Sequence, residues 1–313
     1  MKVLITSPLP LDLKYLLNPF GIEVTIGSGR MTEEEIIESV KDKDGIITLL
    51  RDKIDKNVID SAKNLKIIAN YAVGYDNIDI KFAKDKNIYV TNTPSVLTDA
   101  TADLTFSLLL SCARRISEAD RYVREGNFHG WRPDEMLGMD IKGKTLGIFG
   151  FGRIGQEVMK RSLGFGMNII YTSNFDKKVK GAKKVDFETL LRESDFISLN
   201  ASLNDSNKHS FTINEFKKMK RNAIIVNTAR GQLIKEDDLV YALEQKIINY
   251  AGLDVYEFEP KITEKLKKLD NVILAPHMGS ATVDTRMKMA KICYDSIKDV
   301  LIDKRRPSSC VNC

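Results

Sequence analysis

Three side chains suited to acid–base and anion-binding chemistry follow short apolar runs in the second half of the chain. Arg230 follows a run that ends at Asn227, His277 closes a run that ends at Leu274, and Glu259 precedes Pro260. A guanidinium can hold a carboxylate and polarise a carbonyl, a histidine can protonate an alkoxide, and a carboxylate can keep that histidine charged. Such a set suits hydride transfer to a 2-keto acid. On residue types alone, a salt bridge or a structurally satisfied histidine is the more common role.

A glycine-rich segment provides a second chemical signal. The apolar run that ends at Phe149 meets a G-x-G-x-x-G pattern, and a helical pattern follows from Gln156 to Leu163. The first glycine can make the tight turn, the second lets the backbone approach a pyrophosphate, and the third lets the helix pack closely on the strand. The segment therefore predicts a dinucleotide site, and its candidate residues are Gly150, Gly152, Arg153, Ile154 and Gly155.

The end of the next expected strand, Met167–Thr172, bears on which dinucleotide binds. NAD enzymes usually have Asp or Glu there, which accepts hydrogen bonds from the adenosine ribose. The neutral residues Ser173 and Asn174 occupy this place. A carboxylate would repel a 2′-phosphate, so its absence permits NADP, and Lys177 or Lys178 could add positive charge. We expect NADPH with NADH as the alternative, although the lysines are equally compatible with a solvated surface.

Length, composition and charge limit the class of protein. At 313 residues two domains are expected, and 43% hydrophobic with 29% charged residues is typical of a soluble globular protein. The net charge is +5, but the 48 basic and 43 acidic residues are interspersed, so no nucleic-acid partner is expected. The N-terminal apolar run is too short for a signal peptide or a membrane span, which favours the cytoplasm.

The cysteines and the other histidines give no metal site. Cys310 and Cys313 have C-x-x-C spacing, but no second pair or nearby histidine completes a zinc site. We expect a frayed tail with spare thiols and no metal. His129 and His209 lie in polar loops, where surface or structural roles are the default.

Strand and helix patterns alternate through the chain, which predicts an α/β protein with doubly wound parallel sheets. The expected strands are the run ending at Phe149 and Val3–Thr6, Glu23–Ile26, Gly45–Leu50, Lys66–Asn70, Ile88–Val90, Met167–Thr172, Phe196–Leu199, Ala223–Asn227, Tyr250–Leu253 and Val272–Leu274. The expected helices are Asp12–Leu17, Thr32–Val40, Asp55–Ala62, Ile80–Asp85, Asp99–Arg121, Gln156–Leu163, Asp186–Leu191, Asn214–Met219, Glu236–Gln245 and Ala281–Asp303.

Two strand ends in the first part of the chain stand where such sheets bind ligands. One carries Arg51, and the other continues into a turn with Val73 and Gly74, whose backbone N–H groups could receive a carboxylate. An ordinary strand-to-helix turn is at least as compatible with the second pattern.

Nearly the whole sequence resembles the D-isomer-specific 2-hydroxyacid dehydrogenases. The matching stretches are Asn70–Asp79, Thr91–Pro94, Gly150–Gly155, Asn227–Gly231, Gly252–Val255, Glu259–Pro260 and Pro276–Ser280. The resemblance implies two Rossmann-like domains with a cleft between them, a flavodoxin-like one for the substrate and one for NAD(P). The first would comprise residues 1–98 and 279–313, and the second residues 99–278. Homodimers through the nucleotide domain are usual in this family.

The resemblance also implies roles for individual residues. Arg230 would bind the substrate carboxylate and carbonyl, His277 would be the acid–base group, and Glu259 would hold His277 protonated. The backbone of Val73 and Gly74 would receive the carboxylate. The residues implied on the nicotinamide side are Thr101, Thr228, Ala229, Asp254 and Gly279.

Within the family the motifs look most like the glyoxylate, hydroxypyruvate and 2-ketogluconate reductases. In that branch the tryptophan corresponding to Trp131 can reach the partner's active site. Arg51 departs from the Ser that the branch often has, and a second guanidinium could favour a larger or more polar acid. Ala201 begins a segment that replaces the usual Val-Pro-Leu-Thr beside the adenosine.

The expected activity is NAD(P)H-dependent reduction of one of these 2-keto acids to the D-2-hydroxy acid. Two alternatives remain open at this point. D-lactate or phosphite dehydrogenase could use the same Arg–Glu–His set, and a non-catalytic, dinucleotide-sensing protein similar to the corepressors of this family could use the same fold.

Overall fold

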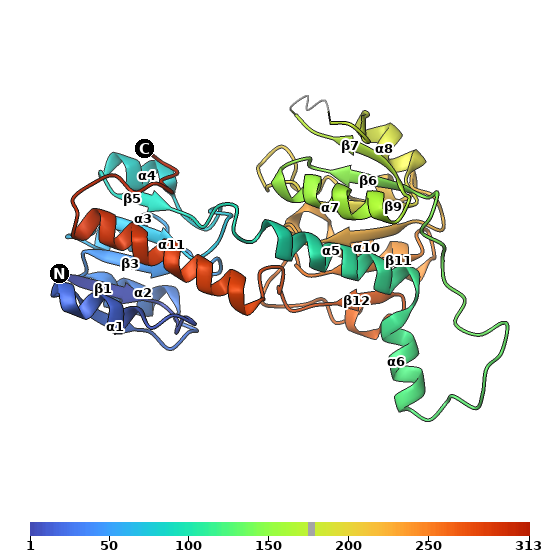
Figure 1. Cartoon of the computed structure of the whole chain (residues 1–313), viewed down its shortest axis with the longest axis horizontal. Helices are drawn as coiled ribbons and strands as arrows, with labels where there is room; N and C mark the ends of the chain where they lie inside the picture. The colour runs from blue at the N-terminus through green and yellow to red at the C-terminus, as the bar shows by residue number, and fades with distance from the viewer. Residues whose placement is uncertain (175–178) are drawn as a thin grey trace. The chain divides into compact units, whose positions relative to one another are not determined.

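The computed structural model describes residues 1–174 and 179–313, which fold into two compact units. Unit 1 comprises Met1–Leu97 and Ser280–Cys313, and unit 2 comprises Thr98–Gly279. Each unit has a parallel sheet covered by helices on both faces (Figure 1), as the alternating pattern predicts. The described residues form no helix that is long and apolar enough to cross a membrane.

Unit 1 has a five-stranded parallel sheet in the order β2-β1-β3-β4-β5. Its strands are β1 (Lys2–Ile5), β2 (Glu23–Ile26), β3 (Gly45–Thr48), β4 (Ile67–Asn70) and β5 (Tyr89–Thr91). Its helices are α1 (Leu13–Leu17), the 3₁₀ helix η1 (Asn18–Phe20), α2 (Glu33–Val40), α3 (Lys56–Ser61), α4 (Ile80–Asp85) and α11 (Val283–Leu301).

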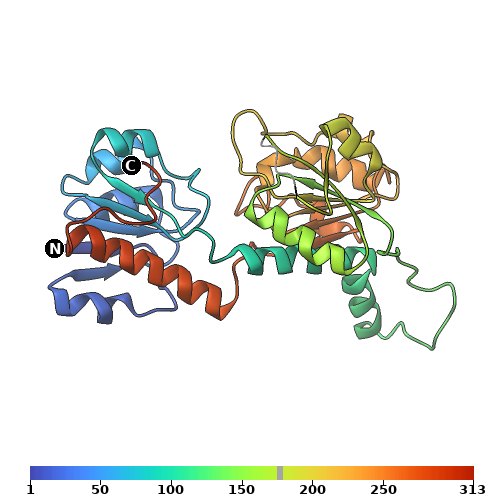
Figure 2. The ribbon, with the colours of Figure 1, turned by 45° about the horizontal axis from the view of Figure 1, so that its top comes forward.

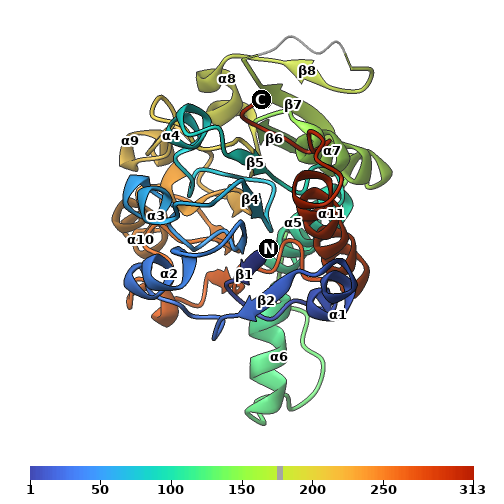
Figure 3. The same ribbon diagram turned by 90° about the vertical axis from the view of Figure 1, so that its left-hand side faces the viewer.

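The two faces of this sheet carry different helices. Figure 3 shows α2, α3 and α4 on one face and α1 with α11 on the other. The central strands β3 and β4 are buried along their whole length, because both faces are covered, and their sequences are accordingly continuous apolar runs. Thr32 and Glu35 form the predicted capping box at the start of α2.

Unit 2 has a seven-stranded parallel sheet in the order β12-β11-β10-β9-β6-β7-β8. Figure 2 shows the strands of this unit between helices. Its strands are β6 (Thr145–Phe149), β7 (Asn168–Thr172), β8 (Lys183–Lys184), β9 (Phe196–Leu199), β10 (Ile224–Asn227), β11 (Tyr250–Leu253) and β12 (Val272–Leu274). Its helices are α5 (Thr98–Ala113), α6 (Ile116–Arg124), α7 (Arg153–Gly164), α8 (Phe187–Glu193), α9 (Ile213–Phe216), α10 (Glu236–Glu244), η2 (Gly231–Leu233) and η3 (Leu266–Lys268). The strand order reverses between β6 and β9, which is where sheets of this type bind nucleotides.

All the expected strands are present, but the single helix expected over Asp99–Arg121 is wrong. The segment forms α5 and α6, separated at Arg115, which has a φ of +55°. The Arg115 guanidinium donates hydrogen bonds to Glu118 in the first turn of α6 and to the Leu137 carbonyl. These bonds stabilise the start of α6 as a separate helix. α5 buries much of its surface, whereas no residue of α6 is buried.

The expected frayed C-terminal tail is also wrong. Cys310 and Cys313 form a disulfide, and the tail runs antiparallel to β5. Val311 N donates to the Val90 carbonyl at 2.8 Å, and the Asn312 amide bonds both Val90 N and the Ile88 carbonyl. The free edge of β5 therefore finds its hydrogen-bonding partners in the last residues of the chain.

Candidate active site

The glycine-rich turn between β6 and α7 permits close backbone approach. Gly150 has a φ of +92°, and a Cβ there would lie 2.4 Å from Ala201 N. A Cβ on Gly155 would lie 2.5 Å from the Gly150 carbonyl oxygen, so strand and helix can pack this closely only with glycine at this position. Gly152, the N-cap residue of α7, faces open space. The turn thus fits a phosphate group at a helix N-terminus.

The remaining cofactor candidates of this region lie around the same turn. Arg153 is exposed in the first turn of α7, and the partly buried Ile154 packs on the unit 2 core. Ser173 directly follows β7 and is partly buried, and Asn174 is exposed. Lys177 and Lys178 lie outside the described residues.

A second cluster of cofactor candidates surrounds Gly279. The carboxylate of Asp254 accepts hydrogen bonds from Met278 N at 2.7 Å and Gly279 N at 2.8 Å. The Thr101 hydroxyl donates to the Gly279 carbonyl at 3.2 Å. Asp254 is fully buried, and burial raises the pKa of its carboxyl, an effect that the two backbone N–H groups and the charge of His277 oppose. Asp254 and Thr101 together fix the residues that follow His277.

Thr105, which the sequence motifs do not single out, extends this cluster. Its hydroxyl lies 2.6 Å from the Thr228 hydroxyl and donates to the Thr101 carbonyl at 2.7 Å. Thr101 and Thr105 are four residues apart on α5 and therefore share one helix face. That spacing was the available signal, but it gains meaning only once β10 is placed against α5.

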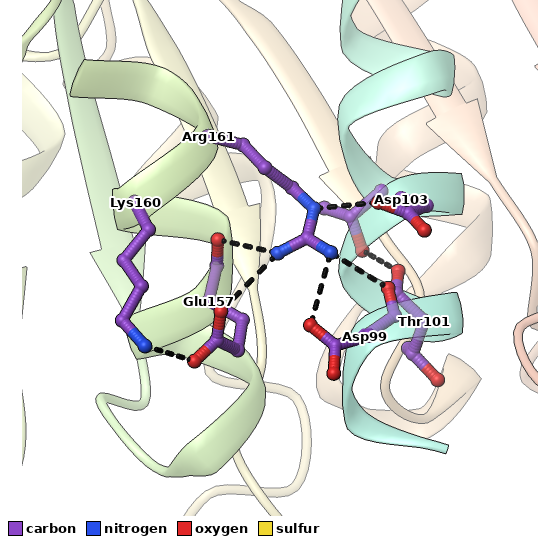
Figure 4. Close-up of polar contacts among 7 residues, drawn as sticks. Asp99, Thr101, Asp103, Glu157, Lys160 and Arg161 are labelled. Carbon is purple, nitrogen blue, oxygen red and sulfur yellow. Dashed lines mark hydrogen bonds and ion pairs between the residues drawn. The ribbon is translucent and has the colours of Figure 1, made fainter. Parts of the chain in front are cut away.

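One guanidinium joins the helix that carries these threonines to the helix of the glycine-rich turn (Figure 4). Arg161 on α7 bonds the Asp99 carbonyl and carboxylate, the Asp103 carboxylate, and both the carbonyl and carboxylate of Glu157. All five N–H groups of the side chain thereby find an acceptor. This network fixes the start of α5, where Thr101 lies, relative to α7.

His277 and Glu259 form a direct pair. His277 Nδ1 lies 2.9 Å from a Glu259 carboxylate oxygen, and the other oxygen accepts a bond from Tyr256 N at 3.0 Å. Burial raises the pKa of Glu259. The hydrogen bond and charge of His277, the Tyr256 N–H and the charge of Arg230 together lower this pKa by more than burial raises it, so the net shift is downward. Glu259 is thus an anion that can hold a positive charge on His277.

Arg230 follows β10 in a turn shaped by Asn227. The Asn227 amide donates to the Arg230 carbonyl at 2.9 Å and accepts from Ala229 N at 3.0 Å, and the Arg230 guanidinium donates to the Ala229 carbonyl at 2.8 Å. At Gly231 a Cβ would lie 1.9 Å from the Tyr256 carbonyl carbon, so this turn packs directly on the segment that leads to Glu259. The three chemical candidates therefore share one edge of the unit 2 sheet.

Unit 1 carries the candidates for substrate binding. Val73 and Gly74 are partly exposed in the turn that follows β4. Arg51 follows β3, the neighbouring strand, and its side chain is 47% exposed, with its Nε 3.8 Å from the Asp52 carboxylate. Parallel strands end at the same edge of a sheet, so Arg51 and the Val73–Gly74 turn are neighbours there.

Two further residues singled out by the sequence, Trp131 and His209, take no part in the hydrogen bonds described above. Trp131 is 83% exposed in the loop that extends beyond α6 in unit 2 (Figure 1). His209 pairs with Glu257 at 2.6 Å, which is a structural contact within unit 2. Among the described residues, no three His, Cys, Asp or Glu side chains gather as a metal site.

The arrangement in unit 2 combines a glycine-rich turn that fits a phosphate group with a histidine paired to a carboxylate and with a guanidinium. Proton donation and charge stabilisation beside a dinucleotide are the requirements of a hydride-transfer enzyme.

Comparisons with known proteins agree with this chemistry. Residues 106–279 match the model of the NAD-binding domain of D-isomer-specific 2-hydroxyacid dehydrogenases. The glyoxylate reductase of Thermococcus litoralis is 51% identical over 300 residues, which cover 93% of this chain and 91% of that protein.

Solved structures of reductases are also similar to this chain. A glyoxylate reductase from Paecilomyes thermophila has a TM-score of 0.89 at 32% identity, covering 99% of this chain and 98% of that one. An NADPH-dependent glyoxylate/hydroxypyruvate reductase from Sinorhizobium meliloti, in complex with NADP and malonate, has a TM-score of 0.89 at 29% identity, covering 99% and 96%. The protein is therefore an oxidoreductase that uses a nicotinamide dinucleotide, and it belongs to the D-isomer-specific 2-hydroxyacid dehydrogenase family.

Proposed function

We propose that this dehydrogenase reduces a small 2-keto acid, namely glyoxylate, hydroxypyruvate or 2-ketogluconate, to the D-2-hydroxy acid. The observation that carries the proposal is the His277–Glu259 pair at 2.9 Å on the same sheet edge as Arg230. Glutamate at this position favours proton-coupled reduction of a keto group, since the carboxylate stabilises a protonated imidazole.

Each residue has a defined task in this proposal. The bound dinucleotide supplies the hydride. Arg230 holds the substrate carboxylate and stabilises the negative charge that develops on the carbonyl oxygen. His277, whose Nδ1 faces Glu259, gives that oxygen the proton on its Nε2. Asp254 and Thr101 hold the backbone after His277, and Thr228 and Ala229 line the nicotinamide side with Gly279.

The substrate class is supported by the relatives and by Arg51. Glyoxylate reductases from two organisms resemble the chain over nearly its full length. In the proposal the N–H groups of Val73 and Gly74 receive the carboxylate, which directs the rest of the acid towards the edge where Arg51 lies. An exposed guanidinium there favours a long, hydroxylated acid such as 2-ketogluconate over glyoxylate.

The cofactor proposed is NADPH in preference to NADH. Ser173 and Asn174 carry no negative charge at the end of β7, so a 2′-phosphate meets no carboxylate there. The reductase from Sinorhizobium meliloti, which has the same fold, was solved with NADP.

We also propose a homodimer formed through unit 2. Helix α6 and the loop that follows it expose large apolar side chains, which is unusual for a surface that faces only water. These side chains are Ile116, Val123, Phe128, Trp131 and Leu137, between 55% and 83% exposed. In such a dimer Trp131 reaches the partner's substrate site and limits the size of the acid.

One assay tests the central proposal. Oxidation of NADPH and of NADH is followed separately with glyoxylate, hydroxypyruvate and 2-ketogluconate as substrates. Turnover of at least one acid, faster with NADPH, is expected. A second assay follows the reduction of NADP⁺ and NAD⁺ with D-lactate or phosphite, and turnover confined to it would overturn the substrate class. Cofactor binding without turnover in either assay would overturn catalysis. Arg230→Lys is assayed beside the wild-type protein as a matched control for the role of Arg230, because lysine keeps the positive charge but lacks the planar guanidinium.

A further inference from the structure

The turn after β4 is held by the residues that directly follow β5. The Asn92 amide donates to the Val73 carbonyl at 2.8 Å, and Thr93 N donates to the Ala72 carbonyl at 2.9 Å. The Asn70 amide donates to the Gly74 carbonyl at 2.8 Å. Three consecutive carbonyls of one turn are therefore fixed, two of them by the segment that follows β5.

These bonds decide where the N–H groups of the turn point. In a planar trans peptide the C=O and the N–H point in opposite directions. A hydrogen bond to the Val73 carbonyl thus sets the direction of the Gly74 N–H, and one to the Ala72 carbonyl sets that of the Val73 N–H. The N–H groups aimed in this way are the pair that receives the substrate carboxylate in the proposed function.

Asn92 is itself well fixed. It is 9% exposed, Thr93 beside it is fully buried, and the backbone N–H of Asn92 donates to the Ser309 carbonyl in the C-terminal tail at 3.3 Å. The tail continues along β5 through Val311 and Asn312. The segment that aims the turn is thus held on its outer side by the antiparallel tail.

We propose that Asn92 is a positioning residue for substrate binding, which aims the Gly74 N–H at the substrate carboxylate through the Val73 carbonyl. This inference rests on the proposed function. Because the N–H contact forms equally in the bound substrate and in the transition state, its loss weakens binding without slowing the reaction of the bound acid.

The test compares Asn92→Ala with Asn312→Ala. Each variant removes an asparagine amide that donates to a backbone carbonyl of unit 1. The acceptor of Asn92 is Val73 in the turn, whereas the acceptor of Asn312 is Ile88, just before β5. Asn92→Ala is expected to raise the KM for the best 2-keto acid about tenfold, with kcat within about twofold and the Kd for the cofactor unchanged. Asn312→Ala should leave the KM unchanged. Equal KM values in the two variants, or a fall confined to kcat, would overturn the inference.

A second readout does not need turnover. Hydrogen exchange of the amides in residues 71–77 should be faster in Asn92→Ala than in Asn312→Ala, because the turn has lost its restraint. If the wild-type protein reduces no 2-keto acid, the proposed function fails, and this exchange difference still tests the positioning role. Equal exchange in the two variants refutes it. Asn92→Asp, which keeps the shape but cannot donate, replaces the alanine variant if the latter does not fold.

Discussion

The two sheets differ in the groups they present beyond their carboxyl ends. Unit 1 presents a turn of backbone N–H groups whose directions are set by Asn70, Asn92 and Thr93. Unit 2 presents ionisable side chains, with His277 paired to Glu259 and Arg230 near enough to lower the pKa of Glu259. Fixed dipoles can select and orient an anion, whereas proton transfer and charge stabilisation need groups that can change or carry charge. In the proposed function, the same architecture thus supplies recognition in one unit and chemistry in the other.

This contrast is tested most severely at Arg230. Arg230→Ala should lower kcat/KM for keto-acid reduction about a thousandfold, because the developing charge on the oxygen loses its guanidinium. The Kd for NADPH should stay within about twofold of the wild-type value. Steady-state kinetics and cofactor fluorescence titration measure both, and near wild-type turnover would remove Arg230 from the chemistry.

The second test removes the charge beside His277. Glu259→Gln should lower kcat for reduction about a hundredfold, since the amide no longer stabilises the protonated imidazole. The KM should change little, in contrast to Asn92→Ala in unit 1. A variant that changed KM alone would place Glu259 with the recognition groups.

The glycine-rich turn gives a matched pair of variants within unit 2. Gly152→Ala meets open space, so stability should be unchanged while the Kd for the cofactor rises about tenfold, because the methyl group occupies room needed by a phosphate. Gly150→Ala places a Cβ against Ala201 at a φ of +92°, and it should lower the free energy of unfolding by about 2 kcal/mol. Thermal melts with and without NADPH separate the two effects.

Arg51 tests whether unit 1 controls selectivity. Arg51→Ser should raise the KM for 2-ketogluconate about fivefold and leave that for glyoxylate within about twofold, because only the longer acid reaches the guanidinium. The kcat for either acid should not change. A uniform effect on both acids would show that Arg51 acts on the turn and not on the distal part of the substrate.

The smallest expected effect is a pH dependence of stability. The pKa of Glu259 is lowered in the folded state from its usual value of 4.5, so its contribution is fully present above that value and is lost as the pH falls through the folded pKa. Glu259→Gln lacks this contribution, which we expect to be about 1 kcal/mol. The difference in unfolding free energy between wild type and variant should therefore narrow from pH 6 to pH 3 in urea titrations. If this difference in unfolding free energy stayed constant from pH 6 to pH 3, the charge of Glu259 would not stabilise the folded state.

The elements with local signals could be predicted from sequence. The glycine-rich turn could be predicted because the need for glycine arises within a few residues of sequence. Gly150 is required by the tight turn, and Gly155 is required by the close packing of helix on strand. The strand ends that carry Arg230 and His277 follow from short apolar runs. Their chemical roles came from the family resemblance, because residue types alone left a structural pair open.

The features that were missed depend on contacts between distant segments. The break at Arg115 depends on bonds to Glu118 and to Leu137, and the order of the C-terminal tail depends on β5, more than two hundred residues earlier. The bond from Asn92 to Val73 likewise requires β4 and β5 to be paired in register. No local pattern encodes such pairings.

The discontinuous make-up of unit 1 has a consequence for how the protein is synthesised. One face of its sheet is covered by α11, whose buried Met289, Cys293, Ile297 and Leu301 pack with strand residues such as Ile5 and Ile67. During translation, residues 98–279 leave the ribosome as an unbroken segment and can fold as a complete unit. The first 97 residues emerge earlier but must wait for α11 with an apolar face uncovered. The sheet of unit 1 therefore keeps one face uncovered until α11 has been synthesised, so the segment that is translated first completes its core only after all of unit 2 has been translated.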